Sequence, residues 1–594
     1  MEIPEQLIPE QLITKHLDVW SSSVKTKSSA GRGSNKKFEL YGVAKLRKLI
    51  LDLAVRGMLI PQDPRDEPAK ELLEKITIER ENLVQRGQIK KQKLPPLLDQ
   101  SEQSFNVPPG WIWTSLLSIC TLENGDRSKN YPNKSMLVKS GIPFINAGDL
   151  QDGYISKKAN SFITEEHYKI LNSGKFRDGD ILFCLRGSLG KSAIVNGFEK
   201  GAIASSLVII RSFSLTSEYF LQKYFDSPLS GQMIDRYDNG TAQPNLSAAD
   251  LGRFCVPLPP FKEQYRIVAK VDELMALCDQ LEQEQESNLE THETLVSTIL
   301  NALTSSSADS SQFADAWQRI QDNFDILFTT ENSFDQLKKT ILQLAVMGKL
   351  VPQDLEDEHA AELAIKGIAE QEQLIKDGKA KRKKALPPIS IDQIPFTLPE
   401  NWLWIRLSEA SFFQEGPGIL AKDFRDSGVP LIRISGMHGT LVSLEGCNFL
   451  DVSMVDKKWS HFSLELGDIV LSSSASLGKV SEVSSETVGC IVYTGLIRFK
   501  TYSSLFKGFL INFFKSSEFI RQINKSKTGT AIKHFGPSHL KEMLIPLPPL
   551  AEQHRIVAKV DELLALCDQL KASLASAQDT QLNLADSLVE QAIN

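Results

Sequence analysis

A segment of 25 residues occurs twice in this chain of 594, and it constrains the fold more than any other feature. PLPPFKEQYRIVAKVDELMALCDQL (257–281) and PLPPLAEQHRIVAKVDELLALCDQL (546–570) are identical at 21 positions. Further upstream, LRKLILDLAVRGMLIPQD (46–63) and LKKTILQLAVMGKLVPQD (337–354) agree at 12 of 18 positions. A chain this long exceeds one hydrophobic core, so we interpret it as an internal duplication of several domains.

Two blocks between the repeats differ from each other almost freely. They share only landmarks: Gly-Asp, Leu-Gly-Lys and Gly-Thr-Ala, which are typical turn residues. The sequence therefore predicts five regions. They are an N-terminal helical scaffold (1–104), a first variable block (105–258), a central helical scaffold (259–395), a second variable block (396–547) and a C-terminal scaffold helix (548–594).

Each variable block contains short runs of β-branched and aromatic residues bounded by Gly, Asn and Ser, which predict strands. Examples are GDILFCL, SAIVNGF and LVIIRSF in the first block, and GDIVLS and GCIVYTGLIRFK in the second. EYFLQKYFDSPLSGQMI predicts a helix. The fold class is therefore α+β, with two globular domains of one fold joined by long repeated helices.

Apolar residues recur every three or four positions through both copies of the repeated segment, which predicts helices at 261–304 and 550–593. Their PLPP motifs end a strand and start each helix. We expect the two seams to pair as an antiparallel intramolecular coiled coil with a pseudo-two-fold axis; the alternative is that each seam packs on its own domain. The second seam is expected to continue through Leu574, Ala577, Gln581, Leu584 and Leu588, and the first to carry a stutter near 285–289. The seam residues are Ile267, Val271, Leu274, Cys278, Leu281, Ile556, Val560, Leu563, Cys567 and Leu570.

Net charge is −7 overall, but the two variable blocks together carry +4 and the remaining scaffold −11. That asymmetry favours readout of bases by a few side chains over strong non-specific phosphate binding. Arg and Lys can contact guanine, and Asn and Gln can contact adenine; the alternative for each is an ordinary solvated surface residue. The candidate DNA-binding residues are Arg127, Lys129, Lys134, Arg186, Lys191, Gln243, Asn245, Lys422, Arg425, Arg433, Lys479, Lys533 and His534.

No catalytic motif is present. RGSLGKS (186–192) ends like a phosphate-binding loop, but Leu185 stands where the first glycine is required, so a turn after a strand is favoured. PLPPF lacks the amide or carboxylate of the Pro-Pro-aromatic motif of amino-methyltransferases. Isolated histidines and cysteines predict neither a metal site nor a cofactor. No apolar run could span a membrane and no secretory signal is visible, so we expect a cytoplasmic protein with reduced cysteines.

The duplicated PLPP…EQ.RIVAKVDEL.ALCDQL helices, flanking two unlike blocks, resemble the specificity (S) subunits of type I restriction–modification enzymes. The N-terminal ITKHLDVW…LRKLILDLAVRGMLIPQD and its echo resemble the branch called IB. The resemblance implies that each block is a target recognition domain for one part of an asymmetric bipartite site in double-stranded DNA. It also implies docking of two adenine methyltransferase (M) subunits on the scaffold, with ATP-dependent restriction (R) subunits in the full complex and no catalysis on this chain.

Two other functions fit parts of the sequence. The chain could be a coiled-coil scaffold that holds two identical partners without reading DNA, or a nucleotide hydrolase that uses 186–192. A footprint without sequence preference would favour the first, and ATP binding by the isolated chain would favour the second. The recognised bases and the spacer length are not encoded in any pattern visible in the sequence.

Overall fold

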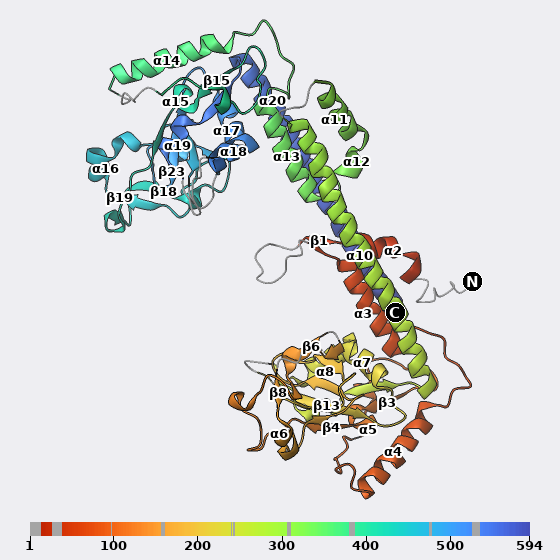
Figure 1. The fold of residues 1–594 in the computed structure, drawn as a ribbon. Coiled ribbons are helices and arrows are strands. Elements are labelled where there is room, and N and C mark those ends of the chain that lie inside the picture. The colour runs from red at the N-terminus through yellow and green to blue at the C-terminus, as the bar shows by residue number, and fades with distance from the viewer. Residues whose placement is uncertain are drawn as a thin grey trace. The chain divides into compact units, whose positions relative to one another are not determined.

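The computed structural model describes residues 13–26, 38–96, 98–151, 153–155, 161–238, 240, 244–305, 310–378, 386–473, 478–525 and 535–593. The chain divides into two compact units. Unit 1 comprises Met1–Asn288 and Gln578–Asn594, and unit 2 comprises Leu289–Ala577 (Figure 1). Each unit therefore contains one variable block; unit 2 is continuous along the chain, whereas unit 1 is completed by a segment that lies far away in the sequence.

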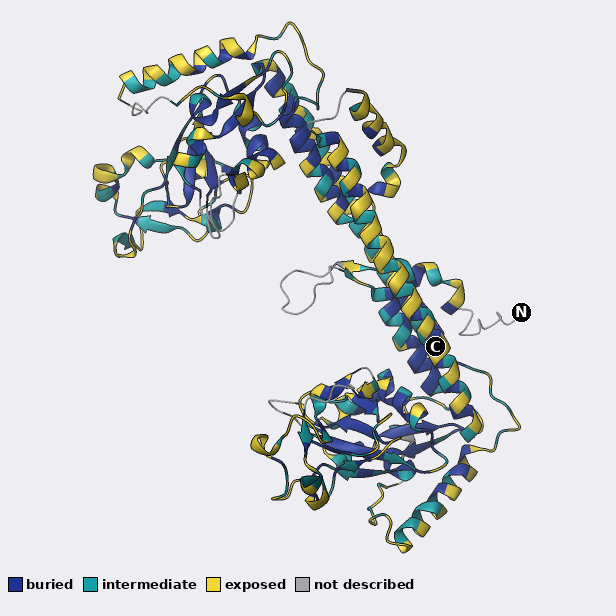
Figure 2. Cartoon of the chain, in the orientation of Figure 1, coloured by how far each residue is buried: buried dark blue, intermediate teal, exposed yellow. Residues whose placement is uncertain are grey.

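The variable block of unit 1 contains two larger sheets. The first has six strands in the order β4 (Cys120–Asn124), β13 (Leu207–Ser212), β10 (Ile181–Cys184), β11 (Ser192–Ile194), β7 (Gly153–Ile155) and β6 (Leu150–Gln151). The second has the order β8 (Phe162–Ile163), β5 (Ile142–Ile145), β12 (Gly201–Ile203) and β9 (Lys175–Phe176). Figure 2 shows the strands buried and the peripheral loops exposed.

The central strand β10 explains why GDILFCL is apolar throughout. Ile181 and Phe183 point into one hydrophobic cluster, with α7 (Glu218–Asp226), whereas Leu182 and Cys184 point into another. Successive side chains of a strand alternate between faces, so a strand covered on both sides needs an unbroken apolar run.

The same arrangement recurs in unit 2. One sheet has the order β16 (Ser411–Glu415), β23 (Leu496–Thr501), β20 (Ile469–Ser472) and β21 (Val480–Glu482). The other has the order β17 (Phe424–Arg425), β19 (Asn448–Leu450), β18 (Val429–Ile432) and β22 (Ile491–Val492). The Gly-Asp glycines, Gly179 and Gly467, have φ of 84° and 82° in the turns before β10 and β20. The prediction of one fold is confirmed, with shared turns at the Gly-Asp and Leu-Gly-Lys landmarks; residues 241–242 and 529–531 of the Gly-Thr-Ala landmark lie outside the described residues.

Each variable block begins and ends on paired strands. In unit 1, β3 (Ile112–Ser115) pairs antiparallel with β14 (Cys255–Leu258). In unit 2, β15 (Leu403–Arg406) pairs antiparallel with β24 (Leu544–Leu547). Because entry and exit lie side by side, each block is an insertion into its scaffold at one place.

The helix predicted from EYFLQKYFDSPLSGQMI is two helices, so that prediction was wrong. Helix α7 ends at Asp226, and α8 (Pro228–Tyr237) begins after Ser227. Pro228 has no N–H to continue the helix, and Oγ of Ser227 donates to the carbonyl oxygen of Tyr224 at 2.7 Å. In unit 2, α17 (Lys507–Lys515) and α18 (Ser517–Lys525) break in the same way without proline, at Ser516.

The two long helices have the predicted bounds, α10 (Phe261–Thr304) and α20 (Leu550–Ile593). In unit 1, seam residues 267–278 share a core with the end of α20, at Ala585, Leu588 and Ala592. In unit 2, seam residues 556–567 share a core with the end of α10, at 296–303. Each unit pairs the beginning of one helix with the end of the other, so the pairing is antiparallel.

A third helix covers each pair: α3 (Tyr41–Arg56) in unit 1 and α13 (Glu331–Val346) in unit 2. The seams thus pack on each other as well as on α3 or α13, so the predicted antiparallel pairing is observed and separate packing of each seam is not. The scaffold is completed by α4 (Ala69–Gln85) and α14 (Ala360–Lys376), which pack on the variable blocks through Leu72 and Leu363.

The seam of α20 departs from the expected heptads after Leu574. Ala577, Gln581 and Leu584 are exposed, and Ala585 is buried instead. Between Leu574 and Leu588 the covered positions lie one residue later than the heptads predict, and Leu588 is buried as predicted. In the helices of the described residues, no segment is long and apolar enough to cross a membrane. All seven cysteines are free, and only Cys447 is not fully buried.

Candidate nucleic-acid interface

Strand directions bring two candidate loops to one edge of the unit 1 sheet. Both β4 and β10 run antiparallel to β13, so they are parallel to each other and their carboxyl ends share an edge. The loop after β4 contains Arg127, Lys129 and Lys134, and the loop after β10 contains Arg186 and Lys191. All five side chains are exposed.

The loop after β4 is shaped by a buried carboxylate. Asp126 accepts hydrogen bonds from the N–H groups of Ser128 (2.7 Å) and Asn172 (2.6 Å). Desolvation by burial opposes ionisation, but these hydrogen bonds prevail and hold the pKa of Asp126 below its ordinary value. The charged carboxylate therefore fixes the turn from which Arg127 and Lys129 project.

Two candidate residues contact each other. Nε of Arg186 donates to Oδ1 of Asn245 at 2.8 Å, and the two residues also form a β-bridge. The bridge ties the segment after α8 to the end of β10. Because an amide oxygen has two lone pairs, Asn245 Oδ1 can accept a second hydrogen bond while Arg186 holds its orientation.

RGSLGKS forms the turn between β10 and β11. The N–H of Cys184 donates to the carbonyl oxygen of Lys191, and Gly190 has φ of 86°. A phosphate-binding loop requires a helix after it, whereas a strand follows here. Lys191 therefore stands on a hairpin turn, available to solvent.

Most of the unit 2 candidates arise from loops equivalent to those of unit 1, because Lys422 and Arg425 follow β16 as the first loop follows β4, and Lys479 corresponds to Lys191; Arg433 has no counterpart among the unit 1 candidates. Lys422, Arg425 and Arg433 belong to the β17–β19–β18 sheet, and Lys479 follows β20; all four are exposed. Arg425 donates to the carbonyl oxygens of Lys422 (3.1 Å) and Phe424 (2.9 Å). Gln243, Lys533 and His534 lie outside the described residues.

Arg433 is held in a defined orientation. Nη1 donates to Oδ1 of Asn448 at 3.0 Å, and the guanidinium lies over the ring of Tyr493, 5.6 Å from its centroid. A stacked, hydrogen-bonded guanidinium loses less side-chain freedom on binding than a free one. Arg433 is therefore the best preorganised candidate reader of unit 2.

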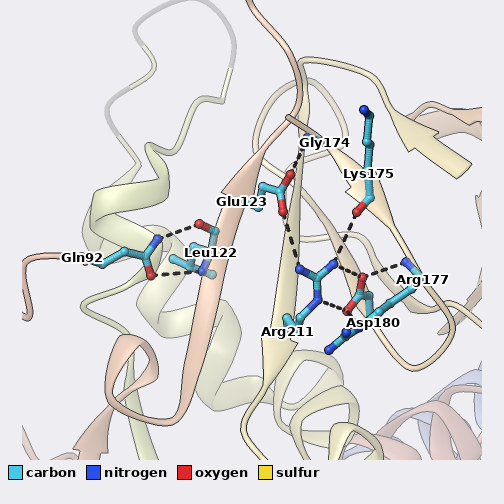
Figure 3. A network of polar contacts seen from close by, with 8 residues as sticks. All are labelled: Gln92, Leu122, Glu123, Gly174, Lys175, Arg177, Asp180 and Arg211. Atoms are coloured by element: carbon cyan, nitrogen blue, oxygen red, sulfur yellow. Dashed lines mark hydrogen bonds and ion pairs between the residues drawn. The ribbon is translucent and has the colours of Figure 1, made fainter. Parts of the chain in front are cut away.

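Sequence reasoning missed an ionic network centred on the amino end of β10, at the edge of the sheet opposite to the loops that follow β4 and β10 (Figure 3). Arg211 contacts Oδ2 of Asp180 (2.7 Å) and Oε2 of Glu123 (3.6 Å). Asp180 also accepts from the N–H of Arg177 at 2.9 Å. The one available signal was that Asp180 is the aspartate of the Gly-Asp landmark shared by both blocks.

Unit 2 has a similar network around the equivalent aspartate, but its arginine and second carboxylate come from different positions. Nε of Arg498 lies 2.5 Å from Oδ2 of Asp468, and the second partner is Glu465 at 2.9 Å. Burial raises the pKa of Asp468, although a backbone hydrogen bond and Arg498 oppose the rise. The Gly-Asp landmark thus marks the frame of the domain and not its reading surface.

A second duplicated contact joins each domain to its scaffold. In unit 2, Glu552 accepts hydrogen bonds from Nε1 of Trp402 (2.9 Å) and Nε2 of Gln353 (2.7 Å). In unit 1, Glu263 accepts from Gln62 at 3.3 Å, and burial raises the pKa of both glutamates. The repeated PQD, Trp and EQ motifs are therefore one docking contact, present twice.

The comparisons with known proteins agree with this organisation. Residues 108–291 and 399–576 match the family model of the type I restriction modification DNA specificity domain. The type I restriction enzyme EcoAI specificity subunit of Escherichia coli is 37% identical over 596 residues, covering 98% of this chain and 100% of that protein. The EcoEI specificity subunit of Escherichia coli is 36% identical, with the same coverage. The crystal structure of the HsdS subunit from Thermoanaerobacter tengcongensis aligns at 18% identity with a TM-score of 0.43, covering 83% of this chain and 99% of that one.

In the described residues, no cluster of His, Cys, Asp and Glu could hold a metal ion.

Proposed function

This chain belongs to the specificity subunits of type I restriction–modification enzymes, in the branch called IB, and from this premise we propose how it reads DNA. It is a DNA sequence-recognition subunit. Residues 105–258 read one part of an asymmetric bipartite site, and residues 396–547 read the other. The observation that carries this proposal is a single fold present twice, with a similar ion pair in each copy and different exposed loop residues.

The division of roles follows from what differs between the copies. In both domains the aspartate of the Gly-Asp turn, Asp180 or Asp468, pairs with an arginine of the adjoining strand, although Arg211 and Arg498 stand two register positions apart. The side chains that could contact bases differ in type and position: Arg186 with Asn245 in one, Arg433 on Tyr493 in the other. Hydrogen bonds to base edges carry sequence information, so unlike loops on like frames suit two unlike half-sites.

The scaffold supports docking of two copies of one partner. On α10 the stripe Ala269, Glu273, Ala276 and Gln280 is exposed; on α20 its counterpart is Ala558, Glu562, Ala565 and Gln569. Packing within the chain explains why the buried seam residues are the same in the two helices. It does not require the exposed residues to be the same. Identical exposed stripes with alanines admit close approach of the same partner helix twice, and we assign them to two methyltransferase (M) subunits.

The long helices are the proposed spacer. At about 1.5 Å per residue, a 44-residue helix extends about 66 Å, which exceeds one turn of DNA, about 34–36 Å. Their length would fix the number of unread base pairs between half-sites.

Catalysis is assigned to the partners: adenine methylation to M, and ATP-driven cleavage to restriction (R) subunits of the full complex. The described residues bring together no set of groups suited to either reaction. We also propose that the scaffold consists of residues 1–104, 259–395 and 548–594. The proposed site of action is the cytoplasm. A scaffold that does not read DNA is not favoured, because the matched family is a DNA specificity domain.

An exchange of domains tests the proposal. Residues 396–547 are replaced by the corresponding block of the EcoAI specificity subunit, and both chains are produced in cells with the M partner. Sequencing of the methylated bases should show one half-site changed and the other retained. A change in both half-sites, or in neither, would refute modular reading. Exchange of 105–258 is the matched control and should change the opposite half-site.

A further inference from the structure

A short basic segment follows α4 and has none of the roles described above. Residues 86–93, RGQIKKQK, carry Arg86, Lys90, Lys91 and Lys93, and no acidic residue occurs from Asn82 to Leu98. All four cationic side chains are exposed, and within the described part of the chain none has an ion-pair partner. They concentrate positive charge in a scaffold whose net charge outside the two blocks is −11.

The segment is held against the recognition domain by two uncharged residues. Nε2 of Gln92 donates to the carbonyl oxygen of Leu122 at 2.7 Å, and the N–H of Leu122 approaches Oε1 of Gln92 at 3.5 Å (Figure 3). Leu122 lies on β4, the edge strand of the six-stranded sheet. The amide of Gln92 thus takes the place of a neighbouring strand, while Ile89 packs against the core.

Both attachments place the segment beside the proposed reading loops. Strand β4 leads directly into the loop that contains Arg127. Further along, Glu102 pairs with Arg236 at 3.6 Å, in the last turn of α8, which precedes Asn245. The lysines therefore project from a fixed strip that borders the loops after β4 and after α8.

We infer that the basic segment 86–93 is a phosphate-binding site for the DNA next to the half-site read by the first domain. The inference rests on the proposed function and extends it. Lysine ammonium groups are point charges on flexible stems, which suit phosphate oxygens and carry no base specificity. The segment precedes the residues that match the family's DNA specificity domain, which begin at 108. It is thus an addition to that domain, supplying affinity where the domain itself carries little net charge.

The sequence after α14 is also basic, at Lys379, Lys381, Arg382, Lys383 and Lys384. Those residues lie outside the described part of the chain, and the inference concerns unit 1 alone.

The test uses the full chain assembled with its M subunit. Lys90, Lys91 and Lys93 are changed together to Gln, which keeps length and polarity but removes charge. The matched control changes three exposed lysines of the same unit, Lys48, Lys70 and Lys262, to Gln. Binding is measured from 0.05 to 0.3 M salt, on a duplex with the methylated motif and on one without it.

Each phosphate contact contributes about 0.9 to the slope of log K against log salt. The segment variant should lower that slope by about 2 to 3 and weaken binding to both duplexes by about tenfold at 0.1 M salt, with sequence preference unchanged. The control should leave slope and preference as in the wild type. In ethylation interference, the segment variant should no longer show a requirement for phosphates outside the half-site of the first domain.

An unchanged slope in the segment variant overturns the inference. If less M subunit is recovered with the segment variant and the slope is unchanged, the inference is also refuted. The segment would then contact the M subunit instead of DNA. Loss of sequence preference in the wild-type complex itself would instead refute the proposed function, so the two failures are distinguishable.

Discussion

Arg211 and Asp180 form an ion pair at 2.7 Å at the amino end of β10, and Arg498 and Asp468 form a similar pair at the amino end of β20 in the second domain. Neither pair is placed to contact a base. Each arginine links a central strand to the Gly-Asp turn and so fixes the frame on which the loops stand. The two domains are therefore similar in their buried strands and ion pairs and differ in the exposed side chains of their loops.

Changing Arg211 to Met should destabilise the first domain. Asp180, which is 1% exposed, would be left charged and without its guanidinium. Breaking a fully buried pair costs about 3–5 kcal/mol; because 24% of the Arg211 side chain is exposed, we expect about 2–3 kcal/mol. Urea unfolding of the full chain measures the loss. Lys200→Met, which breaks the exposed pair with Glu165, is the control and should change little. Equal effects would contradict the role given to Arg211.

Glu552→Gln should remove part of the pH dependence of stability. Burial raises the pKa of Glu552 above 4.5, so the folded state retains a proton that the unfolded state has released. The stabilisation that the protonated Glu552 side chain contributes is complete below the pKa that this group has in the unfolded chain. It is lost as pH rises through the higher pKa of the folded chain. The wild type should lose stability relative to Glu552→Gln from about pH 4.5 upward, measured by unfolding at a series of pH values. Glu562→Gln, on the exposed side of the same helix, should run parallel to the wild type. Identical pH profiles for all three would refute the assignment.

Leu588→Ala and Leu584→Ala distinguish the observed seam from a regular heptad. Leu588 is 6% exposed in the core of unit 1, whereas Leu584 is 47% exposed. We expect a cost of about 2–4 kcal/mol for Leu588→Ala and about 0.5 kcal/mol or less for Leu584→Ala. Thermal unfolding of the two variants side by side is the measurement. A large loss from Leu584→Ala would restore the heptad register predicted from the sequence.

Insertion of one heptad into each long helix should lengthen the recognised spacer. Seven residues add about 10 Å at 1.5 Å per residue, close to three base pairs. Sequencing of methylated DNA from cells that contain the variant and its M partner gives the new motif. Insertion into α10 alone is the control; it mismatches the seams and should abolish methylation. An unaltered spacer after the double insertion would show that the helices are not the ruler.

The sequence predicts the helical scaffold well because its signals are local and repeated. PLPP and the apolar spacing give the bounds of α10 and α20 to the residue. The break at Ser227 was missed because α7 and α8 share one apolar pattern, and a proline at the first turn of a helix resembles one inside it. The slipped seam after Leu574 depends on how a straight helix meets its neighbours, which composition does not encode.

The candidate site is less accessible to sequence reasoning. Exposed Arg and Lys are identifiable, but their partners depend on strand pairing. The contact of Arg186 with Asn245 joins residues 59 apart along the chain, and that of Arg211 with Asp180 joins residues 31 apart. Gln92 carries no recognisable motif; only the edge position of β4 gives it a role.

The core of unit 1 is completed by Ala585, Leu588 and Ala592, which follow the whole of unit 2 along the chain. The supporting helices of the first domain are therefore fully covered only once the second repeat has been synthesised, and a chain cut between the repeats has only another copy of itself with which to cover them. Half-length products of this gene should consequently assemble as dimers with two identical reading domains.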